Sequence, residues 1–467
     1  MATVGPACDT YEQLVELVQA GVDVFRLNMA HSSREDHERR RLDIRRVSEE
    51  LLQPVAILVD LAGPKIRLGE LPGGQIMCPE GGTLRFVRGE TSESPTDLVT
   101  TYEPLVDELR VGNRVMLADG TVSLMVEEQT ADFAVCRVVQ GGIVRSRQGV
   151  NLPGARLSVA ALSDADRDAA VWAAVSGIDF VSLSFVRTSE EVLELKALLR
   201  SRGSAARVIA KIEKPEALQN LDDIIRAADG VMVARGDLGV EIDVAEMPVA
   251  QKRIVATCTR YQKPVIIATQ MLDSMQHSLQ PTRAEVTDVA NAILDGGDAC
   301  MLSGETAIGE HPRAAVEMMQ RIALATEPLF LARPPLPAPD IPAEELHPIT
   351  QAMVYGAGHV ARQLGARLIV VASHSGITAL ALSKLRTFVP VLGVSDSEAT
   401  LRQMCLYWGV TPLPGASPYN SEVLLERIVE WARGIKFVSP GDHVVFVHGT
   451  MLPKPVHNMM VVHQVEG

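Results

Sequence analysis

The chain has 467 residues, of which 47% are hydrophobic and 22% charged, which excludes the disordered, collagen-like and coiled-coil classes of protein. At roughly 100–200 residues per domain, this length predicts two to four domains. The formal net charge of −14 argues against binding to nucleic acid or to an anionic membrane surface. An anionic substrate remains compatible with this charge, because a few Arg and Lys side chains can dominate a small site.

The amino end, residues 1–9, lacks a basic stretch followed by an apolar one, and no apolar run approaches the ~18 residues of a membrane span. We therefore expect a cytoplasmic protein that does not contact membranes. The six cysteines are scattered without a CxxC pair, which predicts reduced thiols, no disulfide and no zinc site.

Short apolar runs rich in Val and Ile recur along the first two thirds of the chain, as in strands buried on both faces of a parallel sheet. Eight runs are predicted as strands: Ala2–Gly5, Val22–Asn28, Val55–Leu61, Asp179–Ser184, Val208–Ile212, Gly230–Ala234, Val265–Thr269 and Ala299–Ser303. Helices are expected between most of them: Tyr11–Ala20, Arg34–Leu52, Glu190–Arg202, Glu216–Ala228, Val249–Tyr261 and Thr282–Leu294. The alternation predicts a closed α/β barrel, (β/α)8, over residues 1–66 and 152–331.

Two further domains are predicted. Residues 67–151, after the third barrel strand, contain short alternating strands punctuated by Gly and Asp, which predicts an inserted small β-barrel domain: Thr83–Val87, Arg114–Leu117, Thr121–Glu127 and Phe133–Val138. The proline-rich residues 332–348 predict a linker. Residues 349–467 predict a C-terminal α/β domain with a mixed or parallel sheet, its strands near Leu368–Ser373, Val389–Ser395, Val444–His448 and Met459–His463.

Polar residues follow most of the barrel runs, and a parallel barrel carries its chemistry at the carboxyl ends of its strands. From the second run to the eighth they are Arg26, Asn28 and His31; Asp60, Lys65 and Arg67; Ser184 and Arg187; Lys211 and Glu213; Arg235 and Asp237; Thr269 and Gln270; Ser303 and Glu305. Charged or hydroxyl residues at seven ends favour one shared site over separate solvated loops.

Two carboxylates, Glu213 and Asp237, follow adjacent strands, so both can face one position on the rim. Paired carboxylates repel unless they share a proton or a cation. Mg²⁺ takes one or two protein carboxylates and keeps positions for water and substrate phosphate, so these residues are candidate metal ligands. The alternative is an ordinary salt bridge from either carboxylate to Lys211, Lys214 or Arg235.

Basic side chains surround this position, namely Arg26, Arg67, Lys211 and Arg187, which indicates a phosphorylated or polyanionic substrate. Lys211 lies two residues before Glu213, on the same face of the strand. Next to a metal, such a lysine can meet the charge on a transferring phosphoryl group.

Eight ordered segments resemble those of pyruvate kinases, along nearly the whole chain. They are residues 4–7 (VGPA), 26–28 (RLN), 60–67 (DLAGPKIR), 151–154 (NLPG), 210–213 (AKIE), 234–239 (ARGDLG), 268–272 (ATQML) and 281–285 with 301–306 (PTRAE and MLSGET). The resemblance implies transfer of the phosphoryl group of phosphoenolpyruvate to ADP, giving pyruvate and ATP.

The resemblance also implies roles for individual residues. Glu213 and Asp237 match the ligands of Mg²⁺, for which Mn²⁺ could substitute. Lys211 matches the lysine that stabilises the transferring phosphoryl group, and Arg26 matches a contact to the substrate phosphate. The substrate carboxylate would be held at Gly236, Asp237 and Thr269, and the nucleotide side would comprise Asn28, His31 and Arg67. Thr269 with a water is the candidate proton relay to the enolate, and the β domain would be a mobile lid that excludes water.

The segments depart from the family's pattern around a potassium ion. Asn28 and Asp60 remain, but Ala30 stands for a Ser and Leu61 for a Thr. Lys65 stands where a Glu would favour the ion. We expect the Lys65 ammonium to supply the charge of the monovalent cation, and therefore activity without potassium.

Three further departures concern the ends and the lid. The chain starts almost inside the family's first strand, and Arg147-Gln148 replaces a basic pair before the NLPG segment. In the C-terminal domain, the segment 373–378 (SHSGIT) resembles the family's sugar-phosphate loop, with Ser373, Ser375, Gly376 and Thr378 as candidate phosphate contacts for a phosphorylated effector. An ordinary strand-to-helix turn with hydroxyl caps is the alternative. A homotetramer is implied by the resemblance alone.

Two other functions stay open on the residues alone. One is a metal-dependent barrel lyase or aldolase acting on pyruvate, which would share Glu213, Asp237 and Arg26 but would need neither the lid nor Lys211. The other is a non-catalytic sensor of sugar phosphates, whose catalytic residues should then be eroded.

Overall fold

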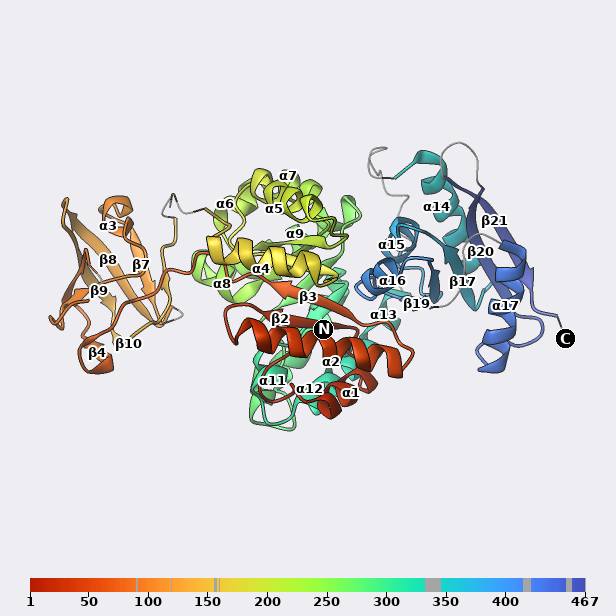
Figure 1. Ribbon diagram of the computed structural model, residues 1–467, viewed down its shortest axis with the longest axis horizontal. Coiled ribbons are helices and arrows are strands. Elements are labelled where there is room, and N and C mark those ends of the chain that lie inside the picture. Colours follow the sequence, from red (N-terminus) through yellow and green to blue (C-terminus); the bar gives the residue numbers. More distant parts are fainter. Residues whose placement is uncertain are drawn as a thin grey trace.

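The chain folds into three bodies arranged in a row, as a computed structural model shows. In Figure 1 the β-rich insertion lies at one end, the barrel in the middle and the C-terminal domain at the other end. The structure describes residues 1–89, 91–118, 120–154, 158, 160–331, 346–414, 421–450 and 456–466.

The central body is a barrel of eight parallel strands, as predicted, and each strand lies within or close to its predicted run. In sheet order they are β1 (Ala2–Thr3), β2 (Val24–Asn28), β3 (Ala56–Asp60), β12 (Phe180–Leu183), β13 (Arg207–Ile212), β14 (Gly230–Ala234), β15 (Val265–Ala268) and β16 (Ala299–Met301). A parallel bridge between Ala2 and Leu302 joins the last strand to the first and closes the barrel.

The strands alternate in which side chains face the inside of the barrel. On β3, Ala56 and Leu58 belong to the apolar cluster inside it. Ile57 and Val59 instead pack under the surrounding helices. Because successive side chains of a strand point to opposite faces, Asp60 points inward like Leu58.

Helices cover the outside of the barrel. They are α1 (Tyr11–Gln19), α2 (Arg34–Glu50), α4 (Asp164–Val175), α5 (Ser189–Ser201), α6 (Pro215–Gln219), α7 (Leu221–Ala227), α8 (Arg235–Glu241), α9 (Met247–Arg260), α10 (Arg283–Asp295), α11 (Gly304–Ala307), α12 (Pro312–Thr326) and α13 (Pro328–Leu331), with short 3-10 turns η2 (Val244–Glu246) and η3 (Asp273–Gln276). A reciprocal capping box at Ser33, and others like it at Thr10, Ser163 and Thr282, begin four of these helices.

One helix that was predicted as continuous is interrupted in the structure. The segment Glu216–Ala228 forms two helices, α6 and α7, which meet at Asn220. Asn220 has φ −101° and ψ 23°, outside the helical region, so it ends one helix and begins the next.

The inserted body is built mainly from antiparallel strands. A six-stranded sheet contains β11 (Val150–Asn151), β7 (Arg114–Leu117), β8 (Val122–Gln129), β9 (Phe133–Gln140), β5 (Thr83–Val87) and β6 (Asp97–Leu98). A separate antiparallel pair contains β10 (Gly142–Arg145) and β4 (Gln75–Cys78). The turn η1 (Pro72–Gly74) and the short helix α3 (Leu105–Glu108) complete it. Its own apolar cluster makes it a body separate from the barrel core.

The C-terminal body has a mixed five-stranded sheet in the order β19 (Val410–Leu413), β18 (Val391–Val394), β17 (Leu368–Ala372), β20 (His443–Thr450) and β21 (Val456–Gln464). Only the pairing of β20 with β21 is antiparallel among the described strands of this sheet. Its helices are α14 (Pro348–Gln363), α15 (Ile377–Lys384), α16 (Glu398–Met404) and α17 (Ser421–Gly434). The predicted linker 332–348 lies mostly outside the described residues, and the predicted domain boundaries stay predictions.

Two sequence-level properties can be compared with the structure. In the described part of the chain, no helix has both the length and the apolar composition needed to cross a bilayer. All six cysteines are free thiols, and four of them are buried.

Candidate active site

The alternation of the strands turns four polar side chains inward near the carboxyl ends of the barrel. Each lies two residues after a side chain of the inner apolar cluster: Arg26 on β2, Asp60 on β3, Ser182 on β12 and Lys211 on β13. A hydrophobic barrel interior thus ends in a polar layer at the rim where parallel barrels carry their sites.

Asp60 is the centre of this layer. Its Oδ2 accepts hydrogen bonds from Nε and Nη2 of Arg26 at 2.8 and 2.6 Å, and its Oδ1 accepts one from Ser182 Oγ at 2.6 Å. The ammonium of Lys211 lies 3.4 Å from Oδ1. Nη1 of Arg26 also donates to Thr3 Oγ1 at 3.1 Å. One carboxylate therefore fixes both the arginine and the lysine.

Lys211 lies between Asp60 and Glu213. Its Nζ is 2.7 Å from Glu213 Oε1 and donates to Ser184 Oγ at 2.9 Å. The second oxygen of Glu213 accepts the backbone N–H of Phe185 at 2.7 Å. Phe185 has φ +57°, so a strained backbone at the end of β12 aims this N–H at the carboxylate.

The charges of this cluster perturb one another. Burial disfavours the ionised form of Asp60, but Lys211 and Arg26 outweigh it and lower its pKa to about 2. Burial works against the charge of Lys211, yet Asp60, Glu213 and Asp237 together raise its pKa. Burial raises the pKa of Glu213, with Asp237 adding to the rise and Lys211 opposing it. Lys211 is therefore a protonated cation at neutral pH.

Asp237 belongs to the first turn of α8, directly after β14. The neighbouring Gly236 N–H donates to Thr269 Oγ1 at 2.7 Å, and Thr269 Oγ1 donates to the carbonyl of Ala268 at 2.6 Å. Thr269 has φ +71°, a conformation that few β-branched residues adopt. Arg235 holds this bend by donating to the Thr269 carbonyl at 2.8 Å.

The two acids suit a hard divalent cation. Among the described residues no three His, Cys, Asp or Glu side chains gather around a common metal position. Mg²⁺ needs only one or two carboxylates, and Glu213 and Asp237 are close enough to raise the pKa of Glu213 through repulsion. The Glu213–Lys211 ion pair foreseen as the alternative is also present, so Glu213 carries both a cation partner and a site suited to a metal.

The residues expected on the nucleotide side lie around the junction with the inserted domain. The carboxamide of Asn28 accepts the N–H of Ala30 at 3.2 Å. Arg67 donates to the carbonyl of Arg147 in the insertion at 3.1 Å. Partial burial lowers the pKa of His31, as do its neighbours Lys65, Arg67 and Arg26. This side of the site is therefore strongly cationic.

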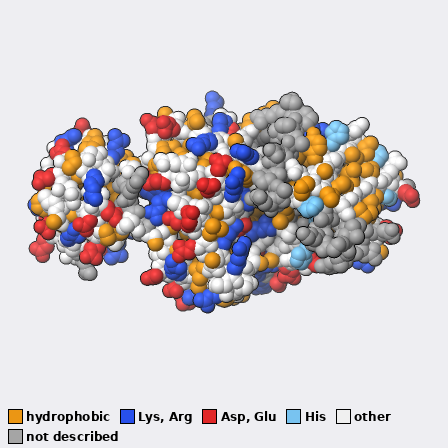
Figure 2. Space-filling model, turned by 90° about the horizontal axis from the view of Figure 1, so that it is seen from above, with side chains coloured by type: hydrophobic (Ala, Val, Ile, Leu, Met, Phe, Trp, Pro, Cys, Tyr) orange, Lys and Arg blue, Asp and Glu red, His pale blue; other side chains and the backbone are white. Residues whose placement is uncertain are grey.

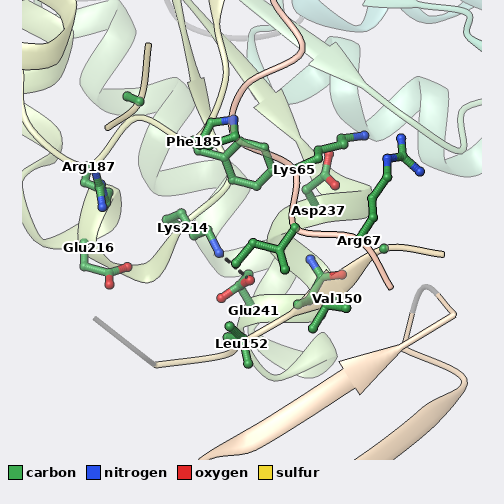
Figure 3. Close-up of a pocket in the computed structure, with 15 residues that line it drawn as sticks. Lys65, Arg67, Val150, Leu152, Phe185, Arg187, Lys214, Glu216, Asp237 and Glu241 are labelled. Carbon is green, nitrogen blue, oxygen red and sulfur yellow. Dashed lines mark hydrogen bonds and ion pairs between the residues drawn. The ribbon is translucent and has the colours of Figure 1, made fainter. Parts of the chain in front are cut away.

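A cavity lies between the barrel and the insertion (Figure 3). Its lining includes Lys65, Arg67 and Asp237 on one side and Lys214 and Glu241 on the other. A second hollow, of about 920 Å³, shares Asp237 with it and extends along Gly236, Thr269 and Ser303. Asp237 thus borders both spaces, and the second has the volume of a small-molecule site.

The segment 373–378 is a capped strand-to-helix turn. The hydroxyl of Ser373 accepts the Gly376 N–H at 3.1 Å, and Gly376 has φ +76°. The hydroxyl of Thr378 is hydrogen-bonded to His457 at 3.0 Å. The carbonyl of Ser375 accepts a bond from Arg207 of the barrel at 2.7 Å. Three of the expected phosphate contacts, Ser373, Gly376 and Thr378, therefore have internal partners, as the alternative turn requires.

Sequence reasoning passed over several residues of this site. It placed Asp60 at the rim and near the potassium position but gave it no role in fixing Arg26 and Lys211, and it omitted Ser182, which pairs with Asp60 across β3 and β12. It also gave no role to the Lys214–Glu241 ion pair. The alternation along β3 and β12 predicts that Asp60 and Ser182 face the inside of the barrel. The contacts of these residues, however, depend on which elements become neighbours in the fold.

A closed barrel with two acids, a buried lysine and a tethered arginine at its carboxyl rim fits the phosphotransferase class of enzyme. Two family models match the chain: "Pyruvate kinase, barrel domain" over residues 1–316 and "Pyruvate kinase, alpha/beta domain" over residues 351–463. The chain therefore belongs to the pyruvate kinase family.

Individual relatives agree with this membership. A pyruvate kinase of Geobacillus stearothermophilus is 40% identical over 99% of this chain and 79% of its own length. One of Agrobacterium vitis is 41% identical over 96% and 92%. A crystal structure of a pyruvate kinase from Cryptosporidium parvum superposes with a TM-score of 0.91 at 33% identity, covering 99% of this chain and 95% of its own.

Proposed function

We propose that this chain transfers the phosphoryl group of phosphoenolpyruvate to ADP, giving pyruvate and ATP, with the residues assembled around Asp60 as its active site. The observation that carries the assignment is the single buried carboxylate that fixes Arg26 and Lys211 next to Glu213. Membership of the family favours this reaction over the lyase and the sensor.

The phosphoryl group is bound by cations that the fold has already oriented. Arg26 and Lys211 contact its oxygens, and Lys211 neutralises charge as the bond between phosphorus and the enol oxygen breaks. Glu213 and Asp237 would hold Mg²⁺ or Mn²⁺, which would supply further positive charge at these oxygens when bound. Because Asp60 holds both basic groups in place, little reorganisation is needed during transfer.

The rest of the substrate lies toward the hollow at Gly236 and Thr269. The backbone around Gly236 and Asp237, with Thr269, receives the substrate carboxylate. After phosphoryl transfer the enolate needs a proton at carbon. The Thr269 hydroxyl, already part of a hydrogen-bond chain, relays this proton through water.

ADP binds on the opposite side of Asp237, in the cavity between barrel and insertion. Arg67 lines this cavity, and Asn28 and His31 are the other proposed contacts to the nucleotide. A terminal phosphate oxygen of ADP forms the new bond to phosphorus. The insertion acts as a lid whose closure excludes water, which would otherwise accept the phosphoryl group.

Lys65 replaces the potassium ion in this proposal. It is exposed, lines the cavity beside Arg67, and contributes to the positive field on His31. An ammonium at this position supplies one positive charge, so the reaction should proceed without a monovalent cation. We predict that kcat changes by less than twofold when tetramethylammonium replaces potassium; a many-fold loss of rate in that assay would contradict the prediction.

A homotetramer in the cytoplasm, with a phosphorylated effector acting at residues 373–378, completes the proposal. Figure 2 shows hydrophobic side chains gathered on the C-terminal domain. They include Ile349 and Tyr355 on α14 and Met459, Val461 and Val462 on the edge strand β21, all at least 36% exposed. An unpaired edge strand with exposed apolar residues is a surface that another subunit can cover.

The reaction is tested by measuring ATP and pyruvate together. With phosphoenolpyruvate, ADP and Mg²⁺, we expect the two products in equal amounts, and no turnover after the divalent metal is chelated. Pyruvate chemistry without ATP would favour the lyase, and absence of turnover with metal present would overturn the proposal.

A further inference from the structure

A buried ion pair lies next to the two metal-binding candidates without belonging to them. Lys214 Nζ is 2.6 Å from Glu241 Oε1, and the side chain of Glu241 is only 2% exposed. Figure 3 shows the pair at the wall of the cavity, with the lysine and the carboxylate pointing at each other. Burying an ion pair is costly, so its retention here calls for a role.

The pair joins the two segments that carry the candidate metal ligands. Lys214 directly follows Glu213 at the end of β13. Glu241 ends α8, the helix whose first turn contains Asp237. The 2.6 Å contact between Lys214 Nζ and Glu241 Oε1 thus links the segment next to Glu213 to the end of the helix that carries Asp237.

The same pair meets both connections to the inserted domain. Asn151, on the last strand of the insertion, lines the same cavity as Lys214 and Glu241. On the other side, Lys214 Nζ lies 5.4 Å from the centre of the Phe185 ring. A Cβ added to Gly63, on the connection into the insertion, would lie 2.6 Å from that ring.

Phe185 links this arrangement to Glu213. Its backbone N–H donates to Glu213 Oε2 at 2.7 Å, and its φ of +57° leaves its ring held between Lys214 and the close backbone of Gly63. Lys214 therefore contacts both the residue that orients Glu213 and the helix that carries Asp237.

We propose that Lys214 and Glu241 are positioning residues, and that their ion pair, here called the brace, sets the separation of Glu213 and Asp237. The brace also anchors β11, the last strand of the inserted domain, next to the two acids. This inference rests on the proposed function, because it assumes that the two acids hold the divalent metal. Both residues line the cavity assigned to ADP, but the brace acts on the two acids through the backbone and ring contacts described above.

The brace is tested by the affinity of the enzyme for Mn²⁺ alone, measured from the electron paramagnetic resonance signal of free Mn²⁺ without substrates. We expect Lys214→Met and Glu241→Gln each to weaken Mn²⁺ binding about tenfold, the effect of losing an outer residue that orients metal ligands. The double variant should be no weaker than either single one, because the two residues act as a unit.

A role of Lys214 through its charge alone predicts a different change in Mn²⁺ affinity. If Lys214 acted only through its positive charge, Lys214→Met would tighten Mn²⁺ binding, since a nearby cation repels the metal. If Lys214 contacted ADP, Lys214→Met would raise the KM for ADP and leave Mn²⁺ affinity unchanged. Either result, or additive effects in the double variant, overturns the brace.

Two controls separate bracing from general loss of structure. Lys196→Met removes another partly buried pair of the barrel, Lys196–Asp229 at 2.7 Å, away from both acids, and should leave Mn²⁺ affinity within twofold. Lys214→Arg retains a cation for Glu241 and should restore most of the affinity. Failure of the wild type to bind Mn²⁺ would count against the metal site itself, whereas normal binding by the variants would count only against the brace.

Discussion

Asp60 shows how one buried side chain can organise a site. A carboxylate with 2% of its side chain exposed is costly to bury, but it receives two hydrogen bonds from Arg26, one from Ser182 and the charge of Lys211. The balance favours the ionised form, as its pKa of about 2 indicates. Removing this charge would leave two cations without their shared partner.

The pH dependence of stability tests this balance. Since the pKa of Asp60 in the folded protein is below the ~3.9 of an unfolded aspartate, its stabilising contribution is present above pH ~4 and is lost as the pH falls toward 2. We predict that Asp60→Asn lowers the thermal midpoint at pH 7 and that the difference from wild type narrows at pH 3. A difference that stays constant over this range would contradict the role of the ionised carboxylate.

At the scale of an element, the turn from β14 into α8 brings Gly236 next to Thr269. A Cβ added to Gly236 would lie 3.5 Å from Thr269 Oγ1, an ordinary van der Waals distance. Gly236 is part of a helix, where Ala is favoured over Gly by about 0.5–1 kcal/mol. Nothing within the described fold thus demands a glycine here, whereas the proposed function gives it a role, the close approach of the substrate carboxylate.

Gly236→Ala tests that reason. We predict an unchanged or higher thermal midpoint and a KM for phosphoenolpyruvate raised about tenfold or more, because the added methyl group would occupy the space of the substrate carboxylate. An unchanged KM would show that the carboxylate binds elsewhere. A lower midpoint would show that the glycine serves the fold.

Most barrel elements could be predicted because their signals are local. The run 56–60 is apolar and β-branched, and it became β3 within a residue or two. The end of a helix depends on finer detail, so Asn220 divided a segment whose periodicity was continuous. β19 was not predicted, because its four residues include a proline and only Val410 is buried.

The residues of the site could be predicted from the sequence, but the contacts between them could not. Lys211 lies on β13 and Glu213 directly follows it, so their proximity could be predicted from the period of two. The contacts of Asp60 join residues 26, 60, 182 and 211, which are distant in the chain and meet only when the barrel closes. The Lys214–Glu241 pair likewise depends on how α8 packs against the end of β13.

At the scale of the whole molecule, buried charge also joins the barrel to the C-terminal domain. Asp298, at the base of β16, is fully buried and pairs with Lys384 at 2.5 Å and Arg386 at 3.0 Å. Burial lowers the pKa of both basic groups, and Asp298 opposes this effect. The contact lies at the opposite end of the strands from Lys211, so the two domains are joined away from the site.

We expect the stability of the protein to depend on the charge of Asp298 at this junction. Asp298→Asn leaves two buried cations without their counter-charge, which costs about 3–5 kcal/mol. We predict a clear fall in the thermal midpoint. Glu317→Gln, in the exposed pair Arg313–Glu317 at 2.8 Å, is the matched control and should have almost no effect. Equal effects in both variants would contradict a stabilising role for the buried junction.

The central event of the proposed function is the neutralisation of the transferring phosphoryl group by Lys211 beside the two acids. The most direct measurement is the rate of ATP formation from phosphoenolpyruvate and ADP by Lys211→Met at saturating substrate, with Mn²⁺ binding measured on the same sample. We predict a fall in kcat of at least ~100-fold with Mn²⁺ still bound. Full activity in this variant would contradict the account.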